Sequence, residues 1–187
     1  MTIDPSILPH QTERLILRPF TVEDLPTFVA YRSDPEVAKY QSWSNYDMAQ
    51  AKAFMAHQDG ATFAHPGTWC QLALELKEGG AHIGDVVIKV LAEDPKQAEV
   101  GFTLAPEHQG RGYATEALRG LLAIAFDALG LHRVIAITDA LNAPAAALLE
   151  RVGFRKEAHL IENIFFKGAW GDEFQFAMLG REWRAKN

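Results

Sequence analysis

A short turn containing two glycines, residues 109–114, lies between a run with strand-like alternation and a run with helical spacing. The amides of such a turn and of the first helical turn have no intrahelical acceptor, and the helix dipole adds about half a positive charge beside them. Gly110 and Gly112 let the backbone approach a ligand without a Cβ in the way, and Arg111 can add a charge-assisted contact. We therefore expect a phosphate-binding site here.

Two common phosphate-binding motifs do not match this turn. A nucleoside-triphosphate loop needs Gly-x-x-x-x-Gly-Lys followed by Ser or Thr, and no Lys-Ser or Lys-Thr pair occurs in the sequence. A dinucleotide fingerprint needs a third glycine where Thr115 stands. The antiparallel hairpin expected upstream also does not suit a doubly wound sheet.

Two titratable residues near the turn are candidates for acid–base chemistry. Glu99 alternates with Gly101 and Thr103, so its carboxylate lies beside a glycine that opens space above it and can act as a general base, directly or through water. A solvated or salt-bridged strand residue is the alternative. His108, in the loop after the strand, is a second candidate, and an exposed loop histidine is its alternative.

The elements that must position these residues follow from hydrophobic periodicity. A crossover helix joins the strands that begin at Ala98 and Val134, and the order β-α-α-β-β-β-α-β-α-β-β predicts a mixed sheet with helices on both faces, an α+β fold. We expect one domain over residues 1–187, with a loose lead-in at 1–12 and a tail at 180–187. Strands are expected at 15–18, 69–76, 83–90, 98–104, 134–138, 155–166 and 172–179, and helices at 21–32, 47–58, 113–128 and 143–151.

Composition excludes several classes of protein. The chain has 187 residues, 48% of them hydrophobic, which predicts an ordinary globular core rather than disorder. A net charge of −6 disfavours broad binding to nucleic acid or to an anionic membrane, because both need a basic surface. Cys70 is the one cysteine, so no intramolecular disulfide can form, and we expect a reducing, cytoplasmic compartment. The histidines and Cys70 show no metal-ligand spacing, so no metal is expected.

A third phosphate-binding motif matches the turn at every position. Residues 109–114 follow the pattern Gln/Arg-x-x-Gly-x-Gly/Ala. In this motif the chain resembles the GNAT N-acetyltransferase superfamily, whose members use the motif to bind the pyrophosphate of acyl-CoA. The resemblance covers about residues 12–179. Within the superfamily, the chain is similar to the branch that contains the ribosomal-protein N-terminal acetyltransferases. The segments that support it are 14–18, 98–102, 113–118, Asn142, 149–154 and 167–172.

The resemblance implies a GNAT fold, with a mostly antiparallel sheet that splays between its fourth and fifth strands, and acetyl transfer from acetyl-CoA to a primary amine. Pantetheine would lie in the gap and pair with the backbone of Phe102, Thr103 and Leu104. The amide of Leu104 would polarise the thioester carbonyl as an oxyanion hole. Asn142 would bond the pantetheine arm. The implied pyrophosphate contacts are Gln109, Gly110, Arg111, Gly112, Tyr113, Ala114 and Thr115.

Two hydroxyl groups common in the family are missing. Members of the family often have a tyrosine where this chain has Leu149, and the N-terminal branch commonly has a serine where it has Ala145. A thiol with a pKa near 8.5 leaves easily as the thiolate, so we expect water to reprotonate it. The missing hydroxyls also leave open a non-catalytic acyl-CoA-binding module.

The acceptor side is the least defined part of the prediction. By the resemblance, the loop at 40–46 and the turn at 166–171 form the substrate pocket, and the acids Asp47, Asp85 and Glu162 could attract a cationic acceptor. We expect a protein or peptide N-terminal α-amine, with a polyamine, amino acid or aminoglycoside as alternatives, and a monomer or homodimer. The candidate substrate contacts are Tyr40, Trp43, Glu99, His108 and Trp170.

Overall fold

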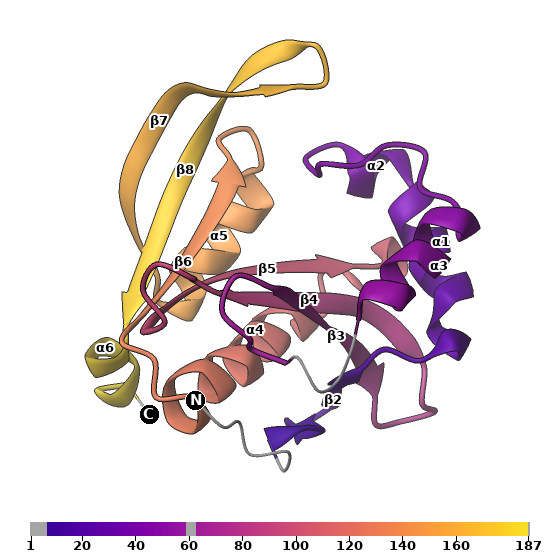
Figure 1. Cartoon of the computed structure of the whole chain (residues 1–187), viewed down its shortest axis with the longest axis horizontal. Helices are drawn as coiled ribbons and strands as arrows, with labels where there is room; N and C mark the ends of the chain where they lie inside the picture. The colour runs from indigo at the N-terminus through magenta and orange to yellow at the C-terminus, as the bar shows by residue number, and fades with distance from the viewer. Residues whose placement is uncertain (1–6, 59–62, 187) are drawn as a thin grey trace.

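A computed structural model describes residues 7–58 and 63–186, in which eight strands form one sheet (Figure 1). Residues 1–6 of the expected lead-in and residue 187 of the expected tail lie outside these ranges. Neighbouring strands are antiparallel except β5 and β6, which are parallel, and the spatial order is β1-β2-β3-β4-β5-β6-β8-β7. The strands are β1 (His10–Gln11), β2 (Leu15–Pro19), β3 (Trp69–Leu76), β4 (His82–Val90), β5 (Gln97–Leu104), β6 (Arg133–Asp139), β7 (Arg155–Phe166) and β8 (Ala169–Leu179).

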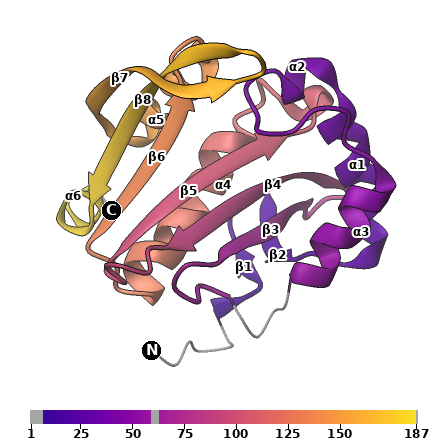
Figure 2. The same ribbon diagram turned by 45° about the horizontal axis from the view of Figure 1, so that its top comes forward.

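Helices cover both faces of the sheet, as expected for a mixed α+β fold (Figures 1 and 2). A larger apolar cluster joins α4 and α5 to one face, through residues such as Leu118, Leu149 and Ile88. A smaller cluster joins α1 and α3 to the other face, through Phe28, Ala51 and others. The helices are α1 (Leu25–Ser33), α2 (Pro35–Ala38), α3 (Met48–His57), α4 (Tyr113–Ala123), α5 (Ala143–Val152) and α6 (Gly180–Arg184), with shorter helical turns at η2 (Val22–Asp24), η4 (Pro106–His108) and η5 (Ile124–Ala128).

The centre of the fold follows from local sequence signals. Gly79 and Gly80, both at positive φ, turn the chain between β3 and β4, and the two strands pair in antiparallel register. The parallel partners β5 and β6 need a crossover, which α4 supplies. Gly153 ends α5 at φ 113°, in the left-handed conformation that favours glycine at a helix C-terminus.

Three short elements were not expected from the sequence. β1 lies inside the predicted lead-in and pairs with β2, α2 begins at Pro35, and α6 lies inside the predicted tail. β8 also begins at Ala169 rather than 172, so the hairpin turn is shorter than predicted. Elements of two to five residues are too short to show a period of 2 or 3.6, and tertiary packing decides whether they form.

Candidate active site

Strands β5 and β6 separate in the middle of the sheet. Their parallel pairing runs from Gln97–Arg133 to Glu99–Ile135 and ends there, whereas β5 stays paired with β4 as far as Leu104. The splay expected between the fourth and fifth predicted strands is therefore confirmed at β5 and β6, which diverge in Figure 2. The gap opens toward the N-terminal end of α4.

The backbone of β5 beyond Glu99 is open on the side of this gap. Ala105 donates its amide to the carbonyl of Ile83 over 3.0 Å, and in an antiparallel pair alternate residues bond the partner strand. The amides of Phe102 and Leu104 therefore face away from β4, toward the gap. Gln109 Nε2 donates to the carbonyl of Leu104 over 3.0 Å and so ties the turn at residues 109–114, called here the phosphate loop after its expected ligand, to the end of the strand. An extended amide-bearing ligand can pair with such an edge.

The phosphate loop has the conformation that its glycines predict. Gly110 lies at φ 72° and Gly112, the residue that precedes α4, at φ 83°. The first intrahelical bond is from the amide of Glu116 to the carbonyl of Gly112, and within the described chain the amides of residues 110–115 have no acceptor. A Cβ at position 110 would meet no atom within 4 Å. These unpaired amides beside open space suit a diphosphate.

Arg14, directly before β2, supports this loop. Its Nη1 donates to the carbonyl of Arg111 over 3.1 Å, its Nε pairs with Glu116 at 2.7 Å, and its guanidinium lies 4.5 Å from the ring centre of Tyr113. Burial acts to raise the pKa of Glu116, but hydrogen bonds from Thr12 and Arg14 outweigh it and lower that pKa. Tyr113 and Glu116 therefore fix the first turn of α4 against β2.

A cavity of about 530 Å³ is lined by residues of both strands that border the gap, β5 and β6. Its walls come from β3, β4, β5, β6 and β8, from the loop after α2, from α5 and from the end of β7. Among the residues expected from the sequence, those in the lining are Tyr40, Trp43, Glu99, Phe102, Thr103 and Asn142. Donor and acceptor candidates therefore share one space.

Glu99 lies on the cavity face of β5, opposite Lys89 of β4. Burial raises the pKa of its carboxyl above the usual value, Lys89 acts to lower it, and the charge of Glu173 on β8 raises it. A raised pKa makes the carboxylate a stronger proton acceptor near neutral pH. The geometry therefore suits the role expected of Glu99.

Asn142 has a structural contact at the start of α5. Its side-chain oxygen accepts from the amide of Ala145 over 3.2 Å and caps the helix. The side-chain NH₂ remains as a donor in the cavity wall, which is compatible with the expected contact to a pantetheine arm. Ala145 and Leu149 line the same wall. The two positions where the family often has a hydroxyl group therefore face the cavity with apolar side chains in this chain.

Two of the expected acceptor contacts, His108 and Trp170, lie outside the cavity lining. His108 ends the turn η4, where its ring faces Tyr113 at 6.4 Å and its buried Nδ1 has no partner among the described residues. Trp170 pairs with Phe165 on the outer face of the β7–β8 hairpin, 61% exposed. Successive strand residues alternate between faces, and it is Ile164 and Phe166 that face the cavity.

Sequence reasoning missed several residues of the acceptor side. Of the three acids considered, Asp85 lines the cavity, whereas Asp47 caps α3 and Glu162 is exposed. Strand alternation could have placed Asp85 on the face of Glu99, but the pairing of β4 with β5 is not visible in the sequence. The further lining residues that were not expected include Arg32, Gln71, Asp139 and Glu173.

Neither a membrane-spanning helix nor a metal-binding cluster is found in the described residues. No helix there is long and apolar enough to cross a membrane. No group of three or more His, Cys, Asp or Glu side chains is placed to hold a metal ion in that part of the chain. What the site does offer is unpaired amides, an open strand edge and carboxylates around one cavity.

A splayed pair of parallel strands with an anion-binding helix N-terminus at the gap is the architecture of an acyl-CoA-dependent acyltransferase. The family model described as "Acetyltransferase (GNAT) domain" matches residues 14–155. N-acetyltransferase p20 of Bacillus licheniformis, which is uncharacterised, is 32% identical over 173 residues, covering 92% of this chain and 96% of p20. The chain therefore belongs to the GNAT acetyltransferase family and is an enzyme of the N-acetyltransferase class.

Solved structures show the same fold. Mycobacterium smegmatis RimJ in complex with CoA-disulfide superposes with a TM-score of 0.80 at 24% identity, covering 94% of this chain and 90% of that one. Spermidine N-acetyltransferase from Vibrio cholerae, in complex with CoA and spermine, gives a TM-score of 0.78 at 24% identity, covering 91% of this chain and 98% of that one. Family membership implies acetyl-CoA as the donor and an amine as the acceptor.

Proposed function

We propose that this enzyme acetylates the α-amine of a peptide or protein N-terminus by direct attack in a ternary complex with acetyl-CoA. The observation that supports this most is the separation of β5 from β6 beyond Glu99, next to the unpaired amides of residues 110–115. The amides would hold the diphosphate, and the open edge of β5 would pair with pantetheine. Phe102, Thr103 and Leu104 would line the thioester, and Leu104 would donate its amide to the carbonyl oxygen.

The reaction needs one proton removed and one returned. The amine nitrogen attacks the acetyl carbon, a C–N bond forms, the C–S bond breaks, and coenzyme A leaves as a thiolate. Glu99 would take the proton from the amine, directly or through water, and water would reprotonate the thiolate. The products are the N-acetylated acceptor and the free thiol of coenzyme A.

An α-amine suits a single carboxylate base. At pH 7 an amine with a pKa near 8 costs about 1 kcal/mol to deprotonate, whereas a lysine-like amine with a pKa near 10.4 costs about 4.6 kcal/mol. Glu99 is the one carboxylate on the cavity side of β5, and Lys89 acts against its raised pKa. A base of this modest strength is sufficient for the first kind of acceptor.

A polyamine is the second candidate, because most of the charged residues that line the cavity are acids. Asp85, Asp139 and Glu173 join Glu99 in the wall, and Arg32 is the one Lys or Arg among the residues that line this cavity. Such a balance favours an acceptor with more than one positive charge. RimJ and spermidine N-acetyltransferase share the fold at 24% identity, so neither likeness decides between the two.

The test is release of coenzyme A thiol from acetyl-CoA in the presence of peptides with free N-termini, polyamines and amino acids. Faster turnover with the peptides than with any polyamine is the expected result. Turnover with polyamines alone would replace the first candidate by the second. Tight binding of acetyl-CoA without turnover on the whole panel would favour a non-catalytic acyl-CoA-binding module.

A further inference from the structure

A second carboxylate of the cavity, Asp85, has no role in the reaction described so far. It lies on β4 directly across from Thr103 of β5, next to the strand segment where the thioester is proposed to lie. Asp85 is only 1% exposed, yet it is one of the residues that line the cavity. A buried carboxylate at such a place costs free energy unless it is bonded or binds a cation.

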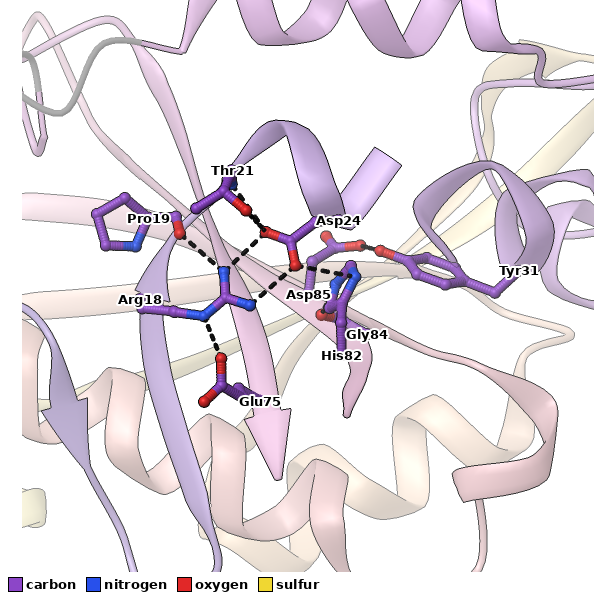
Figure 3. A network of polar contacts seen from close by, with 9 residues as sticks. All are labelled: Arg18, Pro19, Thr21, Asp24, Tyr31, Glu75, His82, Gly84 and Asp85. Atoms are coloured by element: carbon purple, nitrogen blue, oxygen red, sulfur yellow. Dashed lines mark hydrogen bonds and ion pairs between the residues drawn. The ribbon is translucent and has the colours of Figure 1, made fainter. Parts of the chain in front are cut away.

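Two hydrogen-bond donors hold Asp85 in one orientation, and a guanidinium lies near it. Its Oδ1 accepts from the hydroxyl of Tyr31 over 2.5 Å, and its Oδ2 accepts from Gln71 Nε2 over 2.9 Å (Figure 3 shows the Tyr31 contact). Arg32 Nη2 lies 3.6 Å from the same Oδ2, beyond ordinary hydrogen-bond length. A carboxylate offers about four acceptor positions, so these contacts leave room for another donor from the cavity.

Arg32 is itself fixed in the wall and cannot move to close this distance cheaply. Its guanidinium lies 3.9 Å from the ring centre of Trp43 and 4.2 Å from that of Phe28, and its carbonyl accepts from Trp43 Nε1 over 3.1 Å. The guanidinium therefore forms an ion pair with Asp85 at 3.6 Å without a hydrogen bond of ordinary length, which leaves acceptor positions of the charged carboxylate open to the cavity. A cation that enters the cavity would meet that charge in a poorly solvated place.

We propose that Asp85 is a specificity-determining residue that receives the primary ammonium group of the acceptor beside Thr103. This rests on the proposed function, because it deepens the acceptor half of the same site. The recognised chemistry is a primary ammonium, which a peptide N-terminus and a polyamine share. Tyr31 and Gln71 are positioning residues that hold the carboxylate toward the cavity.

The chain offers a matched control in Asp24. It is also a buried carboxylate, 3% exposed, and it pairs with Arg18 and lies 3.7 Å from His82, in the network that Figure 3 shows next to Asp85. It is absent from the cavity lining. Loss of its charge should therefore affect stability but not recognition of the acceptor.

The experiment compares Asp85→Asn with Asp24→Asn, using acetyl-CoA and two probes, spermidine and a trialanine amide with a free N-terminus. For Asp85→Asn we expect the KM of whichever probe reacts to rise about 10- to 100-fold, the usual effect of losing one charged hydrogen bond, with the affinity for coenzyme A unchanged. Asp24→Asn should leave both quantities unchanged while it lowers the melting temperature. The probe that reacts identifies the source of the ammonium.

Several outcomes would overturn the proposal. These are an unchanged acceptor KM in Asp85→Asn, an equal rise in Asp24→Asn, or no binding of either probe to the wild-type complex with coenzyme A. If Asp85→Asn does not fold, butylamine and butanol are compared as ligands of that wild-type complex, and equal affinity for the two overturns it. Failure of the proposed function is distinct, since it would appear as absence of thiol release by the wild-type enzyme with every acceptor.

Discussion

At the scale of single residues, the chemistry of this site depends on how far each carboxylate is removed from water. Glu99 is half-buried, and burial raises its pKa further than Lys89 lowers it. Asp85 is almost fully buried but is bonded by Tyr31 and Gln71. The same side-chain chemistry can therefore serve as a proton acceptor in one place and as a fixed negative charge in the other.

Replacing Glu99 by Gln should lower kcat/KM by about 10²- to 10⁴-fold, the usual contribution of a general base. In the wild type the rate should fall as the pH drops through the raised pKa of Glu99, because only the ionised carboxylate can take a proton. That acid limb should be absent in Glu99→Gln. Initial rates of thiol release between pH 5 and pH 9 measure both effects.

Glu173→Gln is a second variant that tests whether the acid limb of the pH–rate profile belongs to Glu99. Glu173 raises the pKa of Glu99 through its charge, so its neutralisation should move the acid limb to lower pH without removing it. An acid limb that stays in place in both variants would exclude Glu99 as the base.

At the scale of elements, the strand, turn and helix of the proposed donor side could be predicted from sequence. The acceptor side could be predicted only in part, because Tyr40, Trp43 and Glu99 line the cavity but His108 and Trp170 do not. The alternation of β3 and β4, the glycines at 110 and 112 and the helical spacing of α4 are local signals, so the loop and its neighbours were placed correctly. The acceptor wall depends on the register of distant strands. His108 was expected there from its place in the loop after the strand, and Trp170 from the family resemblance of the turn at 166–171, but the direction of a side chain is set by tertiary packing.

The phosphate loop gives a test with a control of matched backbone strain. Gly112→Val should weaken binding of coenzyme A by at least about 100-fold, because its side chain would press on Arg14 Nη2, 3.4 Å from the position of a Cβ, and displace the loop whose amides face the proposed diphosphate. Gly79 has nearly the same conformation, φ 80° against 83°, but lies in the β3–β4 turn. Both variants should lose about 1–2 kcal/mol of stability from the left-handed conformation.

Calorimetric titration with coenzyme A separates the two effects. We expect Gly79→Val to bind like the wild type and Gly112→Val to bind weakly, while both show a similar drop in melting temperature. Equal binding by the two variants would mean that the diphosphate lies elsewhere.

At the scale of the whole molecule, ion pairs join segments that are far apart in the chain. Glu157 of β7 pairs with Arg133 of β6 and with Arg155, and Arg155 also pairs with Glu182 of α6. Hydrogen bonds from Arg133 lower the pKa of Glu157 to about 2, with Arg155 adding to the effect. These contacts fasten the edge of the sheet and the C-terminal helix.

The consequence is a loss of stability in acid. A carboxyl whose pKa is about 2 in the folded state and near 4.5 when unfolded stabilises the fold above the higher value, and that contribution disappears as the pH falls toward the lower one. Glu157→Gln should therefore have a shallower decline of melting temperature between pH 5 and pH 2. Because the pair is near the surface, the loss at neutral pH should be at most about 1 kcal/mol.

Glu78, an exposed acid in the β3–β4 turn with no ion pair among the described residues, provides the control. Glu78→Gln should leave the acid decline of the melting temperature unchanged. Equal behaviour of the two variants in thermal unfolding followed by circular dichroism would contradict this account.

The tip of the β7–β8 hairpin closes on α2, where Lys167 Nζ donates to the carbonyl of Ala38 over 2.6 Å (Figure 2). The two walls that meet there come from the first and last quarters of the chain, whereas the phosphate loop comes from its middle. During synthesis on the ribosome, a nascent chain would thus complete its coenzyme-binding half first. The wall that β7 and β8 give to the cavity would close only after β8 had emerged and paired with β6 and β7.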